Sequence, residues 1–463
     1  MKAVLLVDFG STYTKVTAVD VDAEEILGTG SAYTTIQSDV GDGLRNALNV
    51  LEKATGPLEY SETYACSSAA GGLRMVTSGL VPELTSEAAK MASLGAGAKL
   101  IGIYSYEMTE DDVADINAMK PDIFLLVGGT DGGNKDCIRH NAKMLAASEP
   151  AYPIVIAGNR TVAKECARIL DGREVYVCEN VMPKFGVIKI ESAQKQIREI
   201  FLKNIVKAKG LTKAVSLMND IVMPTPAAVM QAMTLLADGT GSEKGIGELI
   251  GVDVGGATTD VYSIAKGLPQ AMNTVTKGIP EPYAKRTVEG DIGMRYSIRG
   301  IAEAAGIERI AELSGLSEER ASELIDFLSS HTDTLPNGDP DMLALDRALA
   351  SMAVETAVMR HSGTLEETFT MMGQTFVQTG KDLRSVRKVI VTGGSLIHTD
   401  RTAEIAGFSR WSPRQPQSLR PTEADVLVDR KYILAAMGLL SRQYPDVALR
   451  IMKKELEHNG NQE

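Results

Sequence analysis

The feature that most constrains this chain is a short sequence that occurs twice. The segments VLLVDFGSTYTKV and LIGVDVGGATTDV align without a gap at an offset of 245 residues. The alignment pairs Asp8 with Asp253 and Gly10 with Gly255. Because each copy lies between β-rich runs and opens one half of the chain, the repeat predicts duplicated lobes that face a shared cleft.

The residues around each copy are typical of a β-strand, a tight polar turn and a second β-strand. Clusters of Val, Ile, Leu, Tyr and Thr are interrupted by Gly, Ser and Asp, which predicts a β-meander at the N-terminus. Residues 42–55 then place Leu44, Ala47 and Leu51 on one helical face, and this helix is expected to cover the sheet. The fold class is therefore α/β.

Between the two copies the pattern changes. From about 85 to 180, helical and strand-like segments alternate, which predicts a parallel sheet wrapped by helices. The chain is accordingly divided into the following predicted parts: 1–84, the N-terminal part of the first lobe; 85–180, an inserted α/β domain; 181–245, connecting helices and a hinge; and 246–463, the second lobe, with a helical insertion at about 300–385.

Composition excludes several function classes. The net charge is −12 and aromatic residues make up 5%, which disfavours binding to nucleic acid or to an anionic membrane. The four cysteines and five histidines have no zinc or iron–sulfur spacing, so a bound metal is expected to have oxygen ligands. No apolar stretch approaches the length of a membrane span or a signal peptide, and we expect a soluble, cytoplasmic protein.

The two turns have the chemistry of a phosphate site. Glycines and hydroxyls in a tight hairpin can direct successive backbone N–H groups at one anion. An aspartate before each turn would repel phosphate unless Mg²⁺ lies between them, and Mg²⁺ prefers one or two carboxylates plus phosphate oxygens. Lys15 either adds a positive charge or is a solvated strand residue. The candidate nucleotide-binding residues in these turns are Gly10, Ser11, Thr12, Tyr13, Lys15, Gly255, Gly256, Ala257 and Thr258.

A third glycine-containing turn follows a buried strand near residue 390. In VIVTGGS, Gly393 and Gly394, followed by Ser395, would let the backbone approach a flat adenosine. No Walker A sequence is present, and the other glycine-rich stretches lack the strand, turn and helix of a dinucleotide site. The expected ligand is Mg·ATP, with Asp8 and Asp253 holding the metal through water and with Asp8, Asp253 and Asp260 as candidate catalytic carboxylates.

Four motifs resemble those of the actin, sugar-kinase and heat-shock-chaperone ATPase superfamily. DFGSTYTK and DVGGATTD are similar to its two phosphate motifs, TGGS to its adenosine motif, and PTPAA at 224–228 to its first connecting motif. The resemblance implies a two-lobed actin-like ATPase with duplicated ribonuclease-H-like domains. One departure concerns the base: chaperones have a glutamate before Pro-Thr, and Met223 stands there in this chain. Either another carboxylate, Asp8, Asp220, Asp253 or Asp260, acts as base, or hydrolysis is slow.

The inserted segments resemble a narrower family. CSSAAGGLRM, LTSEAAKMASLGAGAK, PDIFLLVGGTDGGN and DRKYILAAMGLL, together with DFGSTYTK, are similar to the MutL/GlmL family associated with glutamate mutase, which is unrelated to the mismatch-repair protein of that name. The resemblance implies a reactivating ATPase that releases damaged cobalamin from an adenosylcobalamin-dependent aminomutase. The mutase substrate and the oligomeric state stay open.

Three rival functions remain at this stage. A small-molecule kinase of the same fold would need a base in the cleft, and a filament-forming actin relative would assemble with ATP. A radical-activator ATPase would need closely spaced cysteines, which Cys66, Cys137, Cys166 and Cys178 are not. The 85–180 insertion is expected to be either a docking module or a scaffold lobe. It lacks the D-x-H-x-x-G signature of a cobalamin ligand, and its His140 lies on a predicted helix.

Overall fold

The structure is a computed structural model, and it divides into two compact units. It describes residues 2–10, 13–34, 40–68, 73–148, 152–207, 220–336, 338–370 and 373–458. The first unit comprises Met1–Ala232, Gly278–Pro282 and Leu434–Ile451, and the second comprises Met233–Lys277, Tyr283–Ile433 and Met452–Glu463. Among the described residues, no helix combines the length and the apolar character needed to cross a bilayer.

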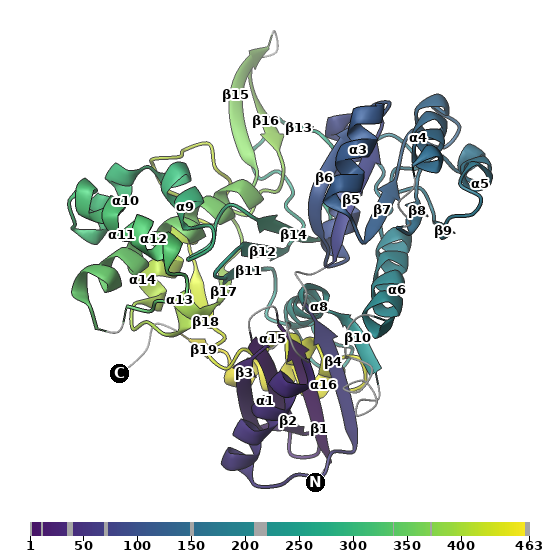
Figure 1. Cartoon of the computed structure of the whole chain (residues 1–463). Helices are drawn as coiled ribbons and strands as arrows, with labels where there is room; N and C mark the ends of the chain where they lie inside the picture. Colours follow the sequence, from purple (N-terminus) through teal and green to yellow (C-terminus); the bar gives the residue numbers. More distant parts are fainter. Residues whose placement is uncertain are drawn as a thin grey trace. The chain divides into compact units, whose positions relative to one another are not determined.

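The first unit contains a five-stranded sheet built on the first copy of the repeat. Its strands, in the spatial order β10-β4-β1-β2-β3, are β10 (Asp220–Pro224), β4 (Glu62–Ser67), β1 (Ala3–Phe9), β2 (Tyr13–Asp20) and β3 (Glu25–Tyr33). The first three strands of the chain form an antiparallel meander, and β4 and β10 continue the sheet in parallel. Helix α1 (Val40–Thr55) lies across β2 and β3 (Figure 1). Leu44, Ala47 and Leu51 are buried there, which confirms the predicted covering helix.

Two helices rich in small residues meet each other beside this sheet. Helix α15 (Leu434–Leu440) packs on β1 and β4, and α8 (Thr225–Asp238) begins where β10 ends. A Cβ added at Gly438 would lie 1.9 Å from the carbonyl oxygen of Ala228, so the two helices meet backbone to backbone. A glycine is required at this crossing.

A second sheet of the first unit is wholly parallel. Its spatial order is β6-β5-β7-β8-β9, with β5 (Arg74–Gly79), β6 (Lys99–Ser105), β7 (Ile123–Leu126), β8 (Ile154–Ile156) and β9 (Val175–Val177). The helices between and after these strands are the π-turn Pro82–Ser86, α2 (Glu87–Gly95), α3 (Glu110–Met119), α4 (Asp136–Ala147), α5 (Arg160–Ile169) and α6 (Glu191–Lys207). The alternation of helix and strand therefore forms the parallel sheet that was expected. Its first strand begins at Arg74, before the expected segment.

The second unit repeats the strand order of the first. Its main sheet runs β14-β12-β11-β17-β18-β19, with β11 (Leu249–Val254), β12 (Thr259–Ile264), β14 (Ala284–Glu289), β17 (Lys388–Thr392), β18 (Asp425–Val428) and β19 (Glu457–His458). Again three antiparallel strands are continued by two parallel ones. Two copies of one ribonuclease-H-like topology confirm the α/β fold class with duplicated domains.

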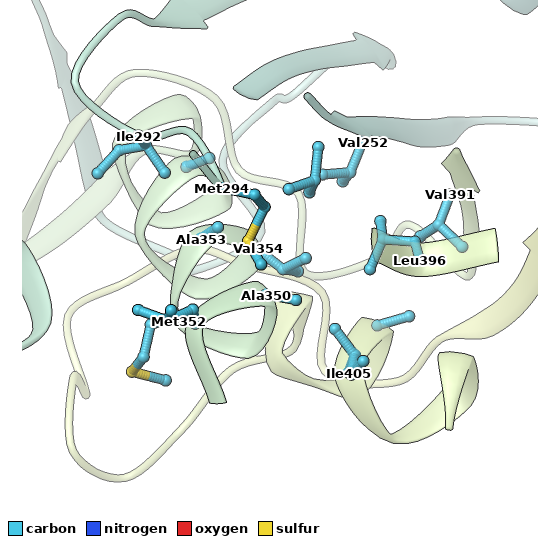
Figure 2. Close-up of a cluster of buried hydrophobic side chains, with 14 of the residues drawn as sticks. Val252, Ile292, Met294, Ala350, Met352, Ala353, Val354, Val391, Leu396 and Ile405 are labelled. Atoms are coloured by element: carbon cyan, nitrogen blue, oxygen red, sulfur yellow. The ribbon is translucent and has the colours of Figure 1, made fainter. Parts of the chain in front are cut away.

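Helices cover this second sheet and form its core. They are α9 (Ile298–Ala305), α10 (Ile307–Ser314), α11 (Glu318–Ser330), α12 (Pro340–His361), α13 (Gly394–Ile397) and α14 (Thr402–Ala406), whereas most of α16 (Pro445–Glu455) belongs to the first unit. Figure 2 shows Ala350, Ala353 and Val354 of α12 in one cluster with Val252 of β11 and Val391 of β17. Small residues on α12 let the helix approach the strands closely.

The expected helical insertion at about 300–385 is wrong beyond residue 361. Thr364–Thr370 (β15) and Gly373–Thr379 (β16) pair as an antiparallel ribbon, and β13 (Thr274–Lys277) adds a third strand in parallel. The physical reason is the local composition, because β-branched residues recur there at every second position, at Thr368 and Thr370 and again at Thr375, Val377 and Thr379, and the helix before them ends at His361.

Candidate functional site

The first hairpin closes between β1 and β2. The Gly10 amide donates to the Tyr13 carbonyl at 3.1 Å, and the Thr34 hydroxyl donates to the Gly10 carbonyl at 2.9 Å. Ser11 and Thr12, two of the predicted phosphate-binding residues, lie outside the described residues. Tyr13 is half exposed, and its ring meets that of Tyr33 edge to face at 5.9 Å.

Asp8 stands at the head of this hairpin and is held by two side chains distant in sequence. The Thr225 hydroxyl donates to Asp8 Oδ1 at 2.6 Å, and the Cys66 thiol donates to the same oxygen at 3.4 Å. Burial raises the pKa of the Asp8 carboxyl, and Lys15, opposite it on β2, opposes that rise. Burial and the neighbouring Asp8 raise the pKa of the Cys66 thiol. The structure thus places Lys15 in register with Asp8 on the neighbouring strand, and it adds Thr225 and Cys66 as contacts of Asp8.

Thr225 was not among the predicted site residues. It lies in the PTPAA stretch that the sequence had singled out, at the first position of α8 and directly after β10. Its neighbour Met223 is buried at 7% exposure. A signal for Thr225 was therefore present, since it is the hydroxyl of that motif, but its partner was not identifiable from the sequence.

The second hairpin, between β11 and β12, has the same closing bond. The Gly255 amide donates to the Thr258 carbonyl at 2.9 Å. Gly256 and Ala257 are exposed at its tip. Within the part of the chain that the structure describes, no acceptor takes the amide N–H groups of Gly256, Ala257 and Thr258. Three successive unpartnered amides are the donors that an anion such as phosphate requires.

Asp260 faces Asp253 across this hairpin and is paired with a buried arginine. Arg286 of β14 donates to Asp260 Oδ1 from Nε at 2.8 Å, and its Nη2 lies 2.6 Å from the same oxygen. The Arg286 guanidinium also lies over the ring of Tyr262, 6.0 Å from its centroid. Burial, with the charge of Asp260, raises the pKa of Tyr262. Arg286 was missed because a lone arginine in a half-polar strand has no distinguishing pattern.

The predicted adenosine turn lies beside the second hairpin. Gly393 has φ of 102°, and a Cβ added there would lie 2.3 Å from the Val254 carbonyl oxygen. Thr392 at the end of β17 is in register with Asp253. Gly394 is exposed, while among the described residues the buried Ser395 hydroxyl has no hydrogen-bond partner. The second unit therefore brings together the hairpin and the glycine turn, two of the three predicted parts of the site.

The carboxylates of these hairpins fit Mg²⁺ in chemical type. Asp8, Asp253 and Asp260 supply oxygen ligands, which Mg²⁺ prefers. In residues 2–458, with the masked gaps set aside, no group of three His, Cys, Asp or Glu side chains gathers in a way that could hold a metal. A magnesium ion here would thus depend on water and on phosphate oxygens for most of its ligands.

Comparison with known proteins gives one family and several fold relatives. The model of the family described as MutL protein matches residues 4–456. Protein MutL of Clostridium tetanomorphum is 47% identical over 463 residues, covering 98% of this chain and 99% of that protein.

Solved structures match with lower similarity. The activator of 2-hydroxyisocaproyl-CoA dehydratase from Clostridium difficile, with bound ADPNP, covers 98% of both chains at 11% identity and a TM-score of 0.34. A ligand-bound xylulose kinase from Lactobacillus acidophilus covers 99% of this chain and 93% of its own at 10% identity and a TM-score of 0.36. A diol dehydratase-reactivating factor in nucleotide-free form covers 96% of this chain and 100% of its own at 11% identity and a TM-score of 0.33. Scores this low do not identify a function.

Proposed function

Because the chain belongs to the MutL family, as its full-length match and its 47% identical relative establish, we propose that it is an ATP-dependent reactivating factor for an adenosylcobalamin-dependent aminomutase such as glutamate mutase. The observation that supports an ATPase most directly is the second hairpin, which has two aspartates in register and three amides without an acceptor among the described residues; these are the groups of a phosphate and magnesium site. We propose a cytoplasmic protein that binds neither nucleic acid nor membrane.

The nucleotide is proposed to bind as its magnesium complex. The amides of Gly256, Ala257 and Thr258 would receive phosphate oxygens, and Gly393 and Gly394 would lie against the adenosine. Asp8 and Asp253 would hold Mg²⁺ through water, and the metal when bound neutralises charge on the phosphate oxygens. The proposal keeps the predicted order of a first lobe, an inserted α/β domain, a connecting segment and a second lobe, but the sheet of the inserted domain begins at Arg74 and the helices of the second lobe's insertion end at His361.

Hydrolysis is proposed to be slow. Met223 is a buried thioether where the resembling chaperones have an acid, so no carboxylate at that position can orient the attacking water. Slow turnover suits a switch that reports its nucleotide state to a partner. A Met223→Glu variant is expected to hydrolyse ATP faster than the wild type, whereas brisk phosphate transfer from the wild type to a small metabolite would identify a kinase instead.

Thermodynamic linkage sets a requirement for the interaction with the partner mutase. A nucleotide can drive release of damaged cobalamin only if the mutase binds the nucleotide states of this protein with different affinity. A tenfold preference corresponds to about 1.4 kcal/mol. We propose that the inserted domain carries much of this contact, because it lies outside the ATPase motifs.

The test uses a mutase that has lost its adenosyl group. Cobalamin release and restored activity are followed with ATP, with ADP and without nucleotide, and release is expected to depend on the nucleotide. Equal release in all three arms would exclude the reactivase. Ile103 in the insertion and Val50 on α1 are matched in exposure, at 46% and 45%. Ile103→Ser is expected to weaken mutase binding, and Val50→Ser is expected to leave it unchanged. Equal effects of the two variants would contradict the proposal that the insertion contacts the mutase.

A further inference from the structure

A short segment after β14 runs along the second hairpin and holds its backbone. We call this segment, Gly293–Ser297, the clasp. Three consecutive carbonyl oxygens of the hairpin are bound by it, namely Gly255 O by the Met294 amide at 3.0 Å, Gly256 O by the amides of Arg295 and Tyr296 at 2.9 Å each, and Ala257 O by the Ser297 hydroxyl at 2.8 Å. The hairpin therefore has a bound edge and a free edge.

The free edge follows from the planarity of the peptide group. In a trans peptide the C=O and the next N–H point in opposite directions. The carbonyls that the clasp binds belong to the same three peptide groups as the amides of Gly256, Ala257 and Thr258. Fixing each carbonyl toward the clasp directs each N–H away from it. These are the three amides that lack an acceptor among the described residues.

The clasp can approach this closely only because Gly293 has no side chain. A Cβ added at Gly293 would lie 2.4 Å from the carbonyl carbon and 2.6 Å from the carbonyl oxygen of Ala257. A methyl group there would displace the hairpin backbone. At Gly290, three residues earlier in the same connection, an added Cβ meets nothing within 4 Å, and the Gly290 carbonyl, which alanine keeps, is a second acceptor for the Ser297 hydroxyl at 3.0 Å.

The clasp is itself fixed to the core of the second unit. The Arg295 guanidinium forms a bidentate pair with Asp346 of α12, at 3.0 and 2.7 Å, and Arg295 is buried. The side chains of Ile292 and Met294 lie in the buried cluster with Ala353 of α12 (Figure 2). A bidentate buried pair and an apolar anchor leave the segment little freedom to move.

We propose that the clasp is the element that pre-orients the phosphate-binding amides of the second unit, with Gly293 and Ser297 as positioning residues. The inference rests on the proposed nucleotide function and adds to it. Amides that are already aligned need no reorganisation when phosphate arrives, so the clasp contributes to affinity for the phosphates and not for the nucleoside.

The experiment compares Gly293→Ala with its matched control Gly290→Ala in the full chain. Calorimetry measures binding of Mg·ADP, of Mg·ADPNP and of adenosine, which has no phosphate. Gly293→Ala is expected to weaken both nucleotides by about tenfold or more, because hydrogen bonds to a charged group are lost. Gly290→Ala should stay within roughly twofold of the wild type. Adenosine affinity should be the same in both variants.

A second pair covers the case in which Gly293→Ala does not fold. Ser297→Ala is expected to weaken nucleotide binding, and Ser297→Thr, which keeps the hydroxyl donor, is expected to restore it. Equal nucleotide affinity in the alanine variants and their controls would overturn the clasp while leaving nucleotide binding intact. A parallel loss of adenosine affinity would overturn it too, since that indicates general distortion. A wild type that binds no Mg·ADP would remove the proposed function and the clasp together.

Discussion

The two hairpins close with the same backbone hydrogen bond and differ in the side chains beside it. Each closes with an amide-to-carbonyl bond between its glycine and the residue three positions later, at 3.1 Å in the first and 2.9 Å in the second. Each aspartate is in register with a charged residue on the next strand, which is Lys15 opposite Asp8 but Asp260 opposite Asp253. The two copies of the repeat thus share the closing bond but differ in the charge of the residue opposite the aspartate.

This difference shifts where positive charge is supplied. In the first hairpin the cation is on the adjacent strand, whereas in the second it is Arg286, one strand further and buried. The second hairpin therefore has two carboxylates, Asp253 and Asp260, beside one cation. The first hairpin has one carboxylate, Asp8, beside one cation. An excess of carboxylate favours binding of a divalent cation, so the second hairpin is expected to contribute more to magnesium affinity.

The largest predicted effect tests the buried cation of the second hairpin. Arg286→Met leaves Asp260 without its partner and is expected to reduce the free energy of unfolding by about 3–5 kcal/mol. Lys15→Met, which removes the cation of the first hairpin, should cost about 1 kcal/mol or less. Denaturant unfolding of both variants measures this contrast. Equal losses would show that the hairpins do not differ as described.

The next prediction concerns magnesium. Asp253→Asn is expected to weaken Mg·ADP binding by roughly 10–100-fold, or about 1.4–2.7 kcal/mol, and Asp8→Asn by less. Calorimetry with and without magnesium separates the metal-dependent part. If Asp8→Asn has the larger effect, the excess carboxylate of the second hairpin does not decide metal binding. If neither variant binds more weakly, the magnesium assignment fails.

The third prediction concerns the hydroxyl of Thr225, which contacts the aspartate of the first hairpin. Thr225→Val removes the hydroxyl that donates to the partly buried Asp8 carboxylate, and it is expected to reduce the free energy of unfolding by about 1–2 kcal/mol. Thr225→Ser keeps the donor and should recover most of that loss. A serine variant as unstable as the valine variant would mean that packing, and not the hydrogen bond, is responsible.

The smallest effect is a difference in pH response. His361 is buried between the hydroxyls of Thr287 and Ser263, each 2.8 Å away, and burial, together with Lys285 and Lys381, lowers the pKa of its imidazole. Below about pH 6.5 the unfolded chain binds a proton that the native imidazole does not. The second unit should therefore lose up to about 1.4 kcal/mol of stability per pH unit on acidification.

The first unit should respond to acid in the opposite direction at Asp8. Burial raises the pKa of this carboxyl above its unfolded value, so protonation as the pH falls through the native pKa relieves a buried charge. His361→Gln should flatten the acid loss, and Asp8→Asn should remove the acid gain. Thermal unfolding from pH 8 down to the ordinary aspartate pKa of about 3.9 measures both slopes. Unchanged slopes in the variants would assign the pH response to other groups.

Sequence patterns over short stretches of the chain predicted several parts of the fold. The repeat at an offset of 245 located both hairpins, and periodicity located α1 and the parallel sheet, because these depend on residues close in sequence. The partners of Asp8 were not predictable in this way, since Cys66 and Thr225 are 58 and 217 residues distant. The clasp was missed for the same reason, because its function lies in backbone contacts with a turn some 40 residues earlier.

The thiol beside Asp8 has a practical consequence. Cys66 is fully buried, so an alkylating reagent can reach its sulfur only when the strands around it transiently open. The rate at which Cys66 is alkylated therefore measures how often the first hairpin opens. This rate is also proportional to the thiolate fraction, which the raised pKa of Cys66 keeps small. A bound nucleotide that stabilises the position of Asp8 would lower the alkylation rate of Cys66. Mass spectrometry of the intact protein can measure this change.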